Sequence, residues 1–198
     1  MKHILRLTLL VSLLLCCSCG IKINGSLRGL YSYYNQTKAE SPELLVRPGK
    51  SISICSLKPG TVSTVYIINA DRLRECLKQH DKAVVYIWNI NCGSEFCYPL
   101  NIMQQACDAN GIELYVVARY YDSKPMKEFN ATERPIFGID TRYYSSNLTS
   151  KYMARFQYDL TASKDYLEHI LYFENGKFVD AYKSIDSLEP AQMSSQAE

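Results

Sequence analysis

The sequence predicts an α/β fold with a mixed central sheet flanked by helices, and three patterns lead to this class. Strand-like and helix-like segments alternate between residues 64 and 120. The run AVVYIW, residues 83–88, is continuously apolar, which is typical of a central strand covered on both faces. Alternating strands and helices at these lengths imply parallel strands joined by right-handed crossovers. The pair Asn175-Gly176 between two apolar segments is a strong hairpin signal, so an antiparallel pair is expected as well.

The first half of the chain is predicted to become regular only after residue 62. Residues 20–61 carry Gly, Ser, Asn and Pro without a sustained period, which indicates an irregular extension with one short strand, SISIC at 51–55. The β-branched and aromatic run TVYIIN at 64–69 predicts a strand. Residues 69–80 predict a helix, in which Leu73, Cys76 and Leu77 share one face and Asn69 or Asp71 can cap the start.

The second half continues the alternation and ends in the hairpin. Residues 99–109 carry one apolar stripe and stop at Asn110-Gly111, which is a common helix end. The remaining predicted elements are a strand at 112–120, a short extra strand at 134–140, a helix at 147–160 and two strands within 169–182. Residues 186–198 lack a periodic apolar face and are expected to be a disordered tail.

The first eighteen residues have the pattern of an export signal. Lys2, His3 and Arg6 are followed by an apolar stretch that is shorter than the roughly 20 residues a membrane span needs. The stretch ends in LLLCCSCG and resembles a bacterial lipoprotein signal, which implies Cys19 as the lipidated first residue and Cys17 as a second candidate. A plain secretory peptide is the alternative. Either signal predicts export, and the lipoprotein reading predicts a protein of the cell envelope, anchored to a bacterial membrane on its periplasmic or surface face.

Charge and composition narrow the expected partners. The formal net charge is +2, and removal of residues 1–18 takes away Lys2 and Arg6, which leaves a net charge of 0. Because a neutral chain without a Lys/Arg run has no electrostatic attraction for phosphates, no nucleic-acid partner is expected. No cofactor is expected either. The remaining 180 or so residues suit one domain with an extension.

The cysteines pose the functional question. Five follow Cys19, and in an oxidising compartment an odd number leaves at least one thiol unpaired unless a metal or a partner takes it. Cys76 and Cys107 lie on apolar helix faces and are predicted to be buried, unreactive thiols. Cys55 fits either role. Cys92 and Cys97, just after the apolar run, could form a redox pair, a metal clip or two small apolar residues.

Here the chain resembles the thioredoxin fold over roughly residues 63–182, which implies a thioredoxin-like domain at 63–185. AVVYIWNINC resembles the strand that leads into the active-site cysteine of that fold, with Trp88 near the position of its tryptophan, and LYFENGKFV resembles its closing hairpin. The extra strand at 134–140 is similar to the insertion in membrane-tethered, thioredoxin-like reductases of cell envelopes. The resemblance implies thiol–disulfide exchange with a protein thiol or disulfide partner, in which Cys92 is the nucleophile and Cys97 the resolving thiol.

Physical chemistry supports a reactive thiol at this position, but three features depart from the family. A cysteine at a strand-to-helix junction faces the positive end of the helix dipole, which lowers its pKa, and Ser94 could cap the first turn. However, the spacing is C-x4-C, and residues five apart on a continuous helix have Cα atoms roughly 8–9 Å apart, too far for a disulfide. Neither Leu167 nor Glu168, the positions that match the cis-proline of the family, is proline, and its last helix has no counterpart here.

These departures leave three alternatives open. A redox-silent thioredoxin-like module would bind a peptide, a glycan or a protein through its aromatic surface, to which sixteen tyrosines contribute. A copper(I) chaperone of the same fold would use both cysteines and a histidine such as His169. The spacing also resembles one peroxiredoxin subgroup, although Asn89 stands where those enzymes have a hydroxyl residue.

Overall fold

A computed structural model describes residues 29–60, 64–128 and 132–188 of the chain. These residues form one seven-stranded sheet in the order β1-β2-β5-β4-β3-β6-β7. The strands are β1 (Leu45–Val46), β2 (Val65–Ile68), β3 (Lys82–Trp88), β4 (Glu113–Ala118), β5 (Ile136–Ile139), β6 (Ile170–Glu174) and β7 (Lys177–Tyr182).

The sheet is mixed, as predicted. The strands from β1 to β3 in the spatial order are parallel, whereas β6 pairs with β3 in the antiparallel sense and β7 pairs with β6 likewise. The short β5 lies between β2 and β4, so the extra strand predicted at 134–140 is part of the sheet. The α/β class is therefore confirmed.

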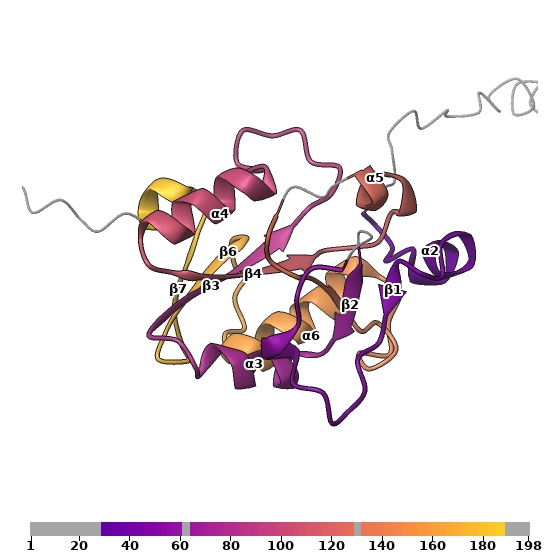
Figure 1. Ribbon diagram of the computed structural model, residues 1–198, viewed down its shortest axis with the longest axis horizontal. Coiled ribbons are helices and arrows are strands. Elements are labelled where there is room, and N and C mark those ends of the chain that lie inside the picture. The colour runs from indigo at the N-terminus through magenta and orange to yellow at the C-terminus, as the bar shows by residue number, and fades with distance from the viewer. Residues whose placement is uncertain (1–28, 61–63, 129–131, 189–198) are drawn as a thin grey trace, which may run out of the picture.

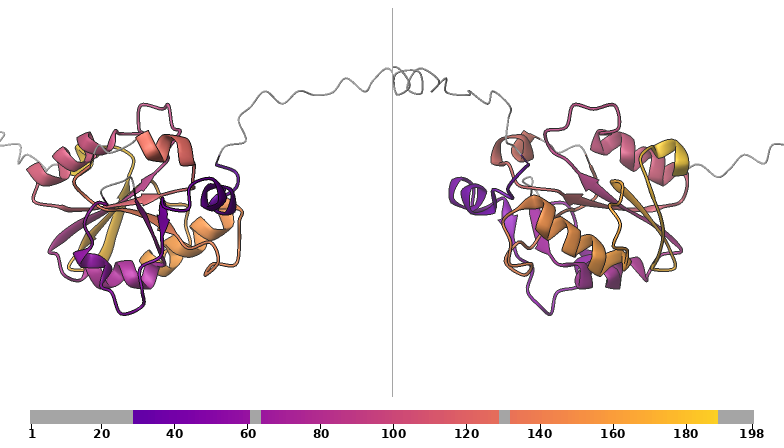
Figure 2. Two further views of the ribbon diagram at one scale, coloured as in Figure 1. Left: turned by 45° about the vertical axis from the view of Figure 1, so that its right-hand side comes forward. Right: turned by 180° about the vertical axis from the view of Figure 1, so that it is seen from behind.

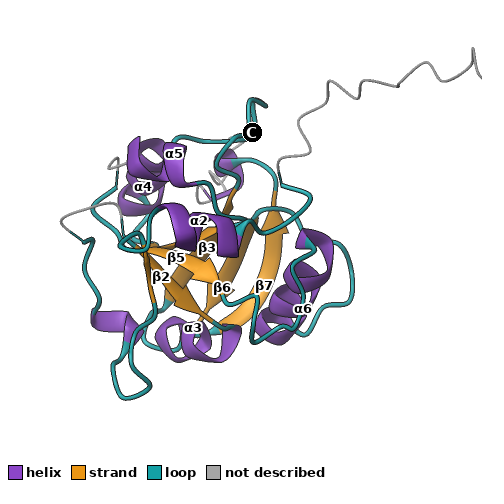
Figure 3. Ribbon diagram, turned by 90° about the vertical axis from the view of Figure 1, so that its right-hand side faces the viewer, coloured by secondary structure: helices purple, strands orange, loops and turns teal. Residues whose placement is uncertain are grey.

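Helices cover both faces of this sheet (Figures 1 and 3). The helices α4 (Leu100–Ala109) and α5 (Ser123–Glu128) pack on one face, and α3 (Ala70–Leu77) and α6 (Thr149–Thr161) pack on the other. Residues of β3 alternate between the two cores, with Val84 in the first and Val85 in the second, both fully buried. This two-sided burial explains why the run at 83–88 has no polar residue.

Local signals in the sequence determine how two of these elements begin or turn. Asn69 caps α3, since its side chain accepts a hydrogen bond from the backbone N–H of Arg72. At the hairpin between β6 and β7, Asn175 and Gly176 have φ angles of 51° and 74°. A Cβ atom on Gly176 would lie 2.9 Å from the Cα of Lys78, so both the backbone angle and the close approach favour glycine here.

The extension before residue 62 has more structure than predicted. It forms α2 (Tyr34–Glu40) and β1, and β1 adds to the free edge of β2. The prediction of a strand at 51–55 is wrong, because residues 51–55 pair with no strand of the sheet and residues Ile54–Ser56 form a short 3-10 helix instead. Figure 2 shows the extension, in indigo, lying against the rest of the described fold.

The predicted disordered tail begins later than residue 186. Residues Ile185–Leu188 form a 3-10 helix, and Leu188 is buried in the same core as α4. The remaining tail residues, the predicted signal at 1–18 and Cys19 lie outside the described residues. Within the part that the structure describes, no helix has the length and apolar character needed to cross a membrane.

Candidate functional site

The cysteine pair lies in the loop between β3 and α4. Cys92 and Cys97 are joined by a disulfide, and their Cα atoms are 5.9 Å apart. This distance suits a disulfide because the segment is not helical: α4 begins only at Leu100. Pro99 precedes the helix in an extended conformation and disfavours helical angles in the residue before it. The expectation that Ser94 caps α4 and that the helix dipole acts directly on Cys92 is therefore wrong.

The Cys92 end of the loop is fixed to β4 and the residues that follow it. The backbone N–H of Asn91 donates to the Tyr120 hydroxyl over 3.2 Å, and the Asn91 side chain donates to Asp122 over 3.0 Å. The backbone N–H of Cys92 closes a turn onto the Asn89 carbonyl. Together these contacts hold the chain where it leaves β3.

The Cys97 end is fixed to the other side of the site. The backbone N–H of Cys97 donates to the Ser94 carbonyl, and the Ser94 hydroxyl donates to the Cys97 sulfur over 3.8 Å. The ammonium of Lys183, just after β7, lies 3.9 Å from the centre of the Phe96 ring. The Tyr86 hydroxyl, on β3, donates to the carbonyl of Tyr98. The two halves of the loop are thus held by different parts of the fold.

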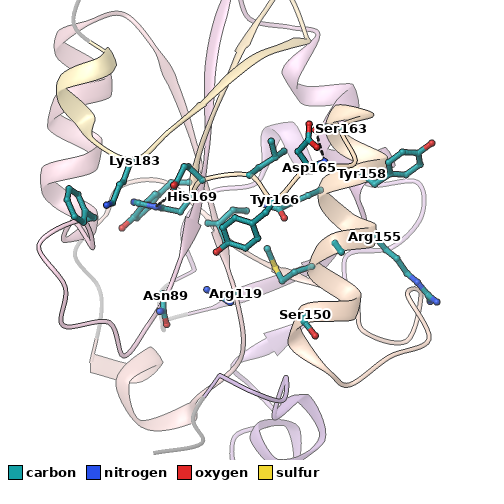
Figure 4. Close-up of a pocket in the computed structure, with 18 of the residues that line it drawn as sticks. Asn89, Arg119, Ser150, Arg155, Tyr158, Ser163, Asp165, Tyr166, His169 and Lys183 are labelled. Atoms are coloured by element: carbon teal, nitrogen blue, oxygen red, sulfur yellow. Dashed lines mark hydrogen bonds and ion pairs between the residues drawn. The ribbon is translucent and has the colours of Figure 1, made fainter.

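The disulfide lies in the wall of a cavity of about 750 Å³. The opposite wall is α6 and the loop between α6 and β6, which places Met153 and Leu167 inside the cavity. Two exposed tyrosines, Tyr158 and Tyr166, stand at this side, and Tyr166 exposes 85% of its surface. Figure 4 shows His169 and Lys183 together on one side of the cavity and Ser150, Arg155 and Tyr158 along α6 on the other. A volume of this size can hold a small organic molecule or a few residues of a peptide.

His169 lines the same cavity as both cysteines, at the start of β6. Its backbone carbonyl accepts a hydrogen bond from the N–H of Ile87, which continues the pairing of β3 with β6. Burial lowers the pKa of His169 below its ordinary value, and the charge of Lys183 acts in the same sense, against the backbone carbonyl of Phe96 and Glu168. The neutral imidazole is thus the favoured form around neutral pH.

The loop that precedes β6 differs from that of the resembled family. Leu167 and Glu168 both line the cavity, and no cis peptide bond occurs in the described part of the chain. The position that would shape the substrate groove in that family is therefore occupied by ordinary trans residues. The groove here is shaped instead by the side chains of Leu167 and of the exposed Tyr166.

A second disulfide joins Cys55 to Cys76, with Cα atoms 5.2 Å apart. The prediction that Cys76 is a free buried thiol is therefore wrong, although its burial is confirmed. Cys76 lies on the face of α3 that packs against the 3-10 helix of Cys55, which the sequence pattern predicted as a strand. Cys107 is the free, buried thiol expected, and burial raises its pKa to about 12.

Several residues of the site were not predicted from the sequence. Met153, Tyr158 and Tyr166 come from α6 and from the loop after it, about 60 to 75 residues after the cysteines, and Lys183 follows the hairpin. The only signal for them is that an aromatic residue stands among the polar residues of the stretch SKDY, at 163–166. Only the folded chain brings them to the disulfide.

Neither the possible metal ligands nor comparison with known proteins identifies the role of this cavity. Among residues 29–60, 64–128 and 132–188, no group of three or more His, Cys, Asp or Glu residues is arranged to hold a metal ion. No protein-family model, no curated protein and no solved structure matches the chain.

Proposed function

We propose that this chain is a thioredoxin-like, envelope-anchored protein that exchanges electrons with a partner thiol or disulfide through Cys92 and Cys97. The observation that carries the proposal is the position of the pair. Both cysteines are partly exposed, and both line a cavity of about 750 Å³. A disulfide must be open to an attacking thiolate before it can exchange.

The order of elements supports the thioredoxin-like part of this proposal. The series β2, α3, β3, α4, β4, α6, β6 and β7 follows the strand and helix order of the resemblance, and β5 is the extra strand. The cysteines follow the second strand of that series, and the antiparallel hairpin closes the sheet. The trans residues before β6 remain a departure from the family.

The proposed reaction transfers two electrons. A partner thiolate attacks the sulfur of Cys92, the Cys92–Cys97 bond breaks, and Cys97 leaves as a thiolate that takes up a proton. A second partner thiolate then attacks the partner sulfur, so that Cys92 leaves and the partner becomes oxidised to a disulfide. In the reverse direction, the Cys92 thiolate attacks a partner disulfide and Cys97 releases the partner.

A redox-silent binding module is the second candidate, and the rim of the cavity favours it. Tyr158 and Tyr166 expose 47% and 85% of their surface beside an apolar floor, and exposed aromatic side chains are common at binding sites. In this case the Cys92–Cys97 bond would only shape the loop.

Turnover of a model disulfide separates these two candidates. The reduced chain is mixed with a small aromatic disulfide, and the release of its thiol is followed for the wild type, Cys92→Ser and Cys97→Ser. The redox proposal predicts release of two thiols per wild-type chain as the Cys92–Cys97 disulfide forms again, and a stable mixed disulfide on Cys92 of Cys97→Ser. If the wild type releases thiol no faster than the double variant that carries both Cys92→Ser and Cys97→Ser, the binding module is the better account.

The envelope anchor is a separate part of the proposal and needs its own test. Cells that express the full chain are fed a fatty acid with a clickable alkyne, and the label on the protein is compared with that on Cys19→Ser. We expect label on the wild type only. Equal label on the wild type and on Cys19→Ser, or no label on either protein, would contradict an anchor at Cys19.

A further inference from the structure

The Cys92–Cys97 disulfide is not symmetric in its surroundings. The Ser94 hydroxyl lies 3.8 Å from the sulfur of Cys97. A disulfide sulfur has no hydrogen, so the hydroxyl must be the donor and the sulfur the acceptor. Among the described residues, no comparable donor reaches the sulfur of Cys92.

The donor is held in place by its own loop. The Ser94 oxygen accepts a hydrogen bond from the backbone N–H of Phe96 over 3.2 Å, and the Ser94 carbonyl accepts the N–H of Cys97 over 3.0 Å. With its oxygen engaged as an acceptor, the hydroxyl hydrogen is left to point at the sulfur. The turn therefore holds the hydroxyl beside the Cys97 sulfur in the closed disulfide.

One positive charge, that of Lys183, lies near the Cys97 end of the loop, and a second, that of Arg119, lines the cavity after β4. Lys183 stacks on the ring of Phe96, the residue next to Cys97, whereas the Cys92 end contacts Tyr120 through Asn91. The carboxylate of Glu95 is exposed, so water screens its opposing charge. The Ser94 hydroxyl is thus the group that distinguishes Cys97 from Cys92, and Lys183 adds positive charge beside the neighbouring Phe96.

We propose that Ser94 is a catalytic residue that stabilises the sulfur of Cys97 as it leaves, so that an attacking thiolate is directed to Cys92. The attacking sulfur forms a bond to Cys92, the Cys92–Cys97 bond breaks, and its electron pair stays on Cys97 with the Ser94 hydroxyl as donor. A leaving thiol that is better stabilised leaves faster, which sets the site of attack. This inference rests on the proposed function.

The test locates the sulfur that is attacked. The oxidised full-length protein is mixed briefly with glutathione and quenched with excess N-ethylmaleimide, and peptides are mapped by mass spectrometry. In the wild type we expect glutathione on Cys92 and maleimide on Cys97. The ratio of this product to its opposite should fall by about fivefold in Ser94→Ala, as expected for the loss of one hydrogen bond of ordinary strength.

Two further variants control for changes in folding. Ser94→Thr keeps the hydroxyl and should restore most of the wild-type ratio. Ser56→Ala removes an exposed hydroxyl next to the other disulfide, which bonds to the carbonyl of Ser53 and not to a sulfur, and should change nothing. Ser94 itself is exposed, so its loss removes little packing.

The outcomes separate this inference from the proposed function. Glutathione on Cys97, or a ratio that Ser94→Ala leaves unchanged, overturns the role of Ser94 while the pair still exchanges. If glutathione forms no adduct with either cysteine of the native wild type, the proposed exchange itself is contradicted, and the role of Ser94 falls with it.

Discussion

The two disulfides of this chain differ in the length of the loop that they close and in the burial of their sulfurs. Cys55–Cys76 spans 21 residues, and its Cys76 end is fully buried in the core under α3. Cys92–Cys97 spans only 5 residues, and both of its ends are partly exposed at a cavity. The first joins two elements of the fold, whereas the second lies within one loop.

The two disulfides therefore differ in how much they stabilise the fold and in how easily a thiolate can reach them. The entropy that a disulfide removes from the unfolded chain grows with the length of the loop it closes, so the longer link stabilises more. Exchange requires an open path for a thiolate and a place for the leaving thiolate. Both sulfurs of the shorter link are partly exposed at the cavity, whereas in the longer link only Cys55 is partly exposed and its partner Cys76 is fully buried. The structure thus assigns a structural bond to one pair and leaves the other available for chemistry.

The largest expected effect is on stability. Cys55→Ser should lower the free energy of unfolding by about 3 kcal/mol, and Cys92→Ser by about 2 kcal/mol, given the lengths of the closed loops. Denaturation in urea of both variants under oxidising conditions measures the two values. A greater loss for Cys92→Ser would reverse the comparison.

An ion pair joins the extension before residue 62 to the end of β5, and its effect on stability depends on pH. Arg47, which directly follows β1, forms an ion pair with Asp140, whose side chain is 10% exposed. Burial opposes ionisation of Asp140, but Arg47 and the N–H groups of Tyr143 and Arg142 hold its net pKa below the ordinary value.

Loss of this carboxylate should destabilise the fold by about 1–2 kcal/mol at pH 7, less than for a fully buried pair because Arg47 is half exposed. Because the folded pKa is lowered, this stability is present above the unfolded pKa of about 3.9 and is lost as the pH falls through the folded value. Unfolding of Asp140→Asn between pH 3 and pH 7 tests it. A loss that is as large at pH 3 as at pH 7 would show that charge is not the cause.

A smaller pH effect belongs to His169, beside the Cys92–Cys97 loop, and it comes from burial of the imidazole and not from an ion pair. The lowered pKa of His169 means that the folded protein binds a proton less readily than the unfolded chain. Stability from this group is therefore complete above the unfolded pKa of about 6.5 and declines as the pH falls below it. His169→Gln should flatten the dependence of stability on pH between 7 and 5 by less than about 1 kcal/mol. An unchanged slope would contradict the burial of the ring.

The smallest effect is expected at Cys107, the free cysteine, and it concerns labelling of its thiol. Cys107 is fully buried, and a pKa of about 12 leaves almost no thiolate at pH 8. Iodoacetamide should not label it in the native protein within the time that labels the reduced Cys92–Cys97 pair. Labelling of all three at one rate would mean that the fold opens as a whole.

The sequence predicts the centre of the fold better than its edges. The continuous apolar run at 83–88 indicates a central strand, and the pair Asn175-Gly176 indicates a tight turn between two strands. Both β3 and the hairpin are found where these local signals place them. The segment at 51–55 alternates like a strand, but it pairs with no strand, and Ile54–Ser56 form a 3-10 helix instead. Whether a segment finds a strand partner depends on the whole sheet and cannot be read from five residues.

The site shows the same limit. Cys92 and Cys97 stand out because an apolar run ends beside them, and the structure indeed joins them. Cys76 was assigned by its helical spacing alone, which reports burial and not the neighbour that the buried face meets. Tyr166 and Lys183 have no local pattern, since only the crossing of α6 and the hairpin brings them to the cavity.

Selective reduction tests the central claim most directly. The native protein is treated with increasing dithiothreitol, quenched with N-ethylmaleimide and mapped by mass spectrometry for each cysteine. We expect Cys92 and Cys97 to be labelled at least about a hundredfold faster than Cys55 and Cys76. Attack on the partly exposed Cys55 would release a thiolate at Cys76, and that sulfur is fully buried and must wait for local unfolding. Equal rates, or faster loss of the Cys55–Cys76 bond, would contradict the division of roles between the two disulfides.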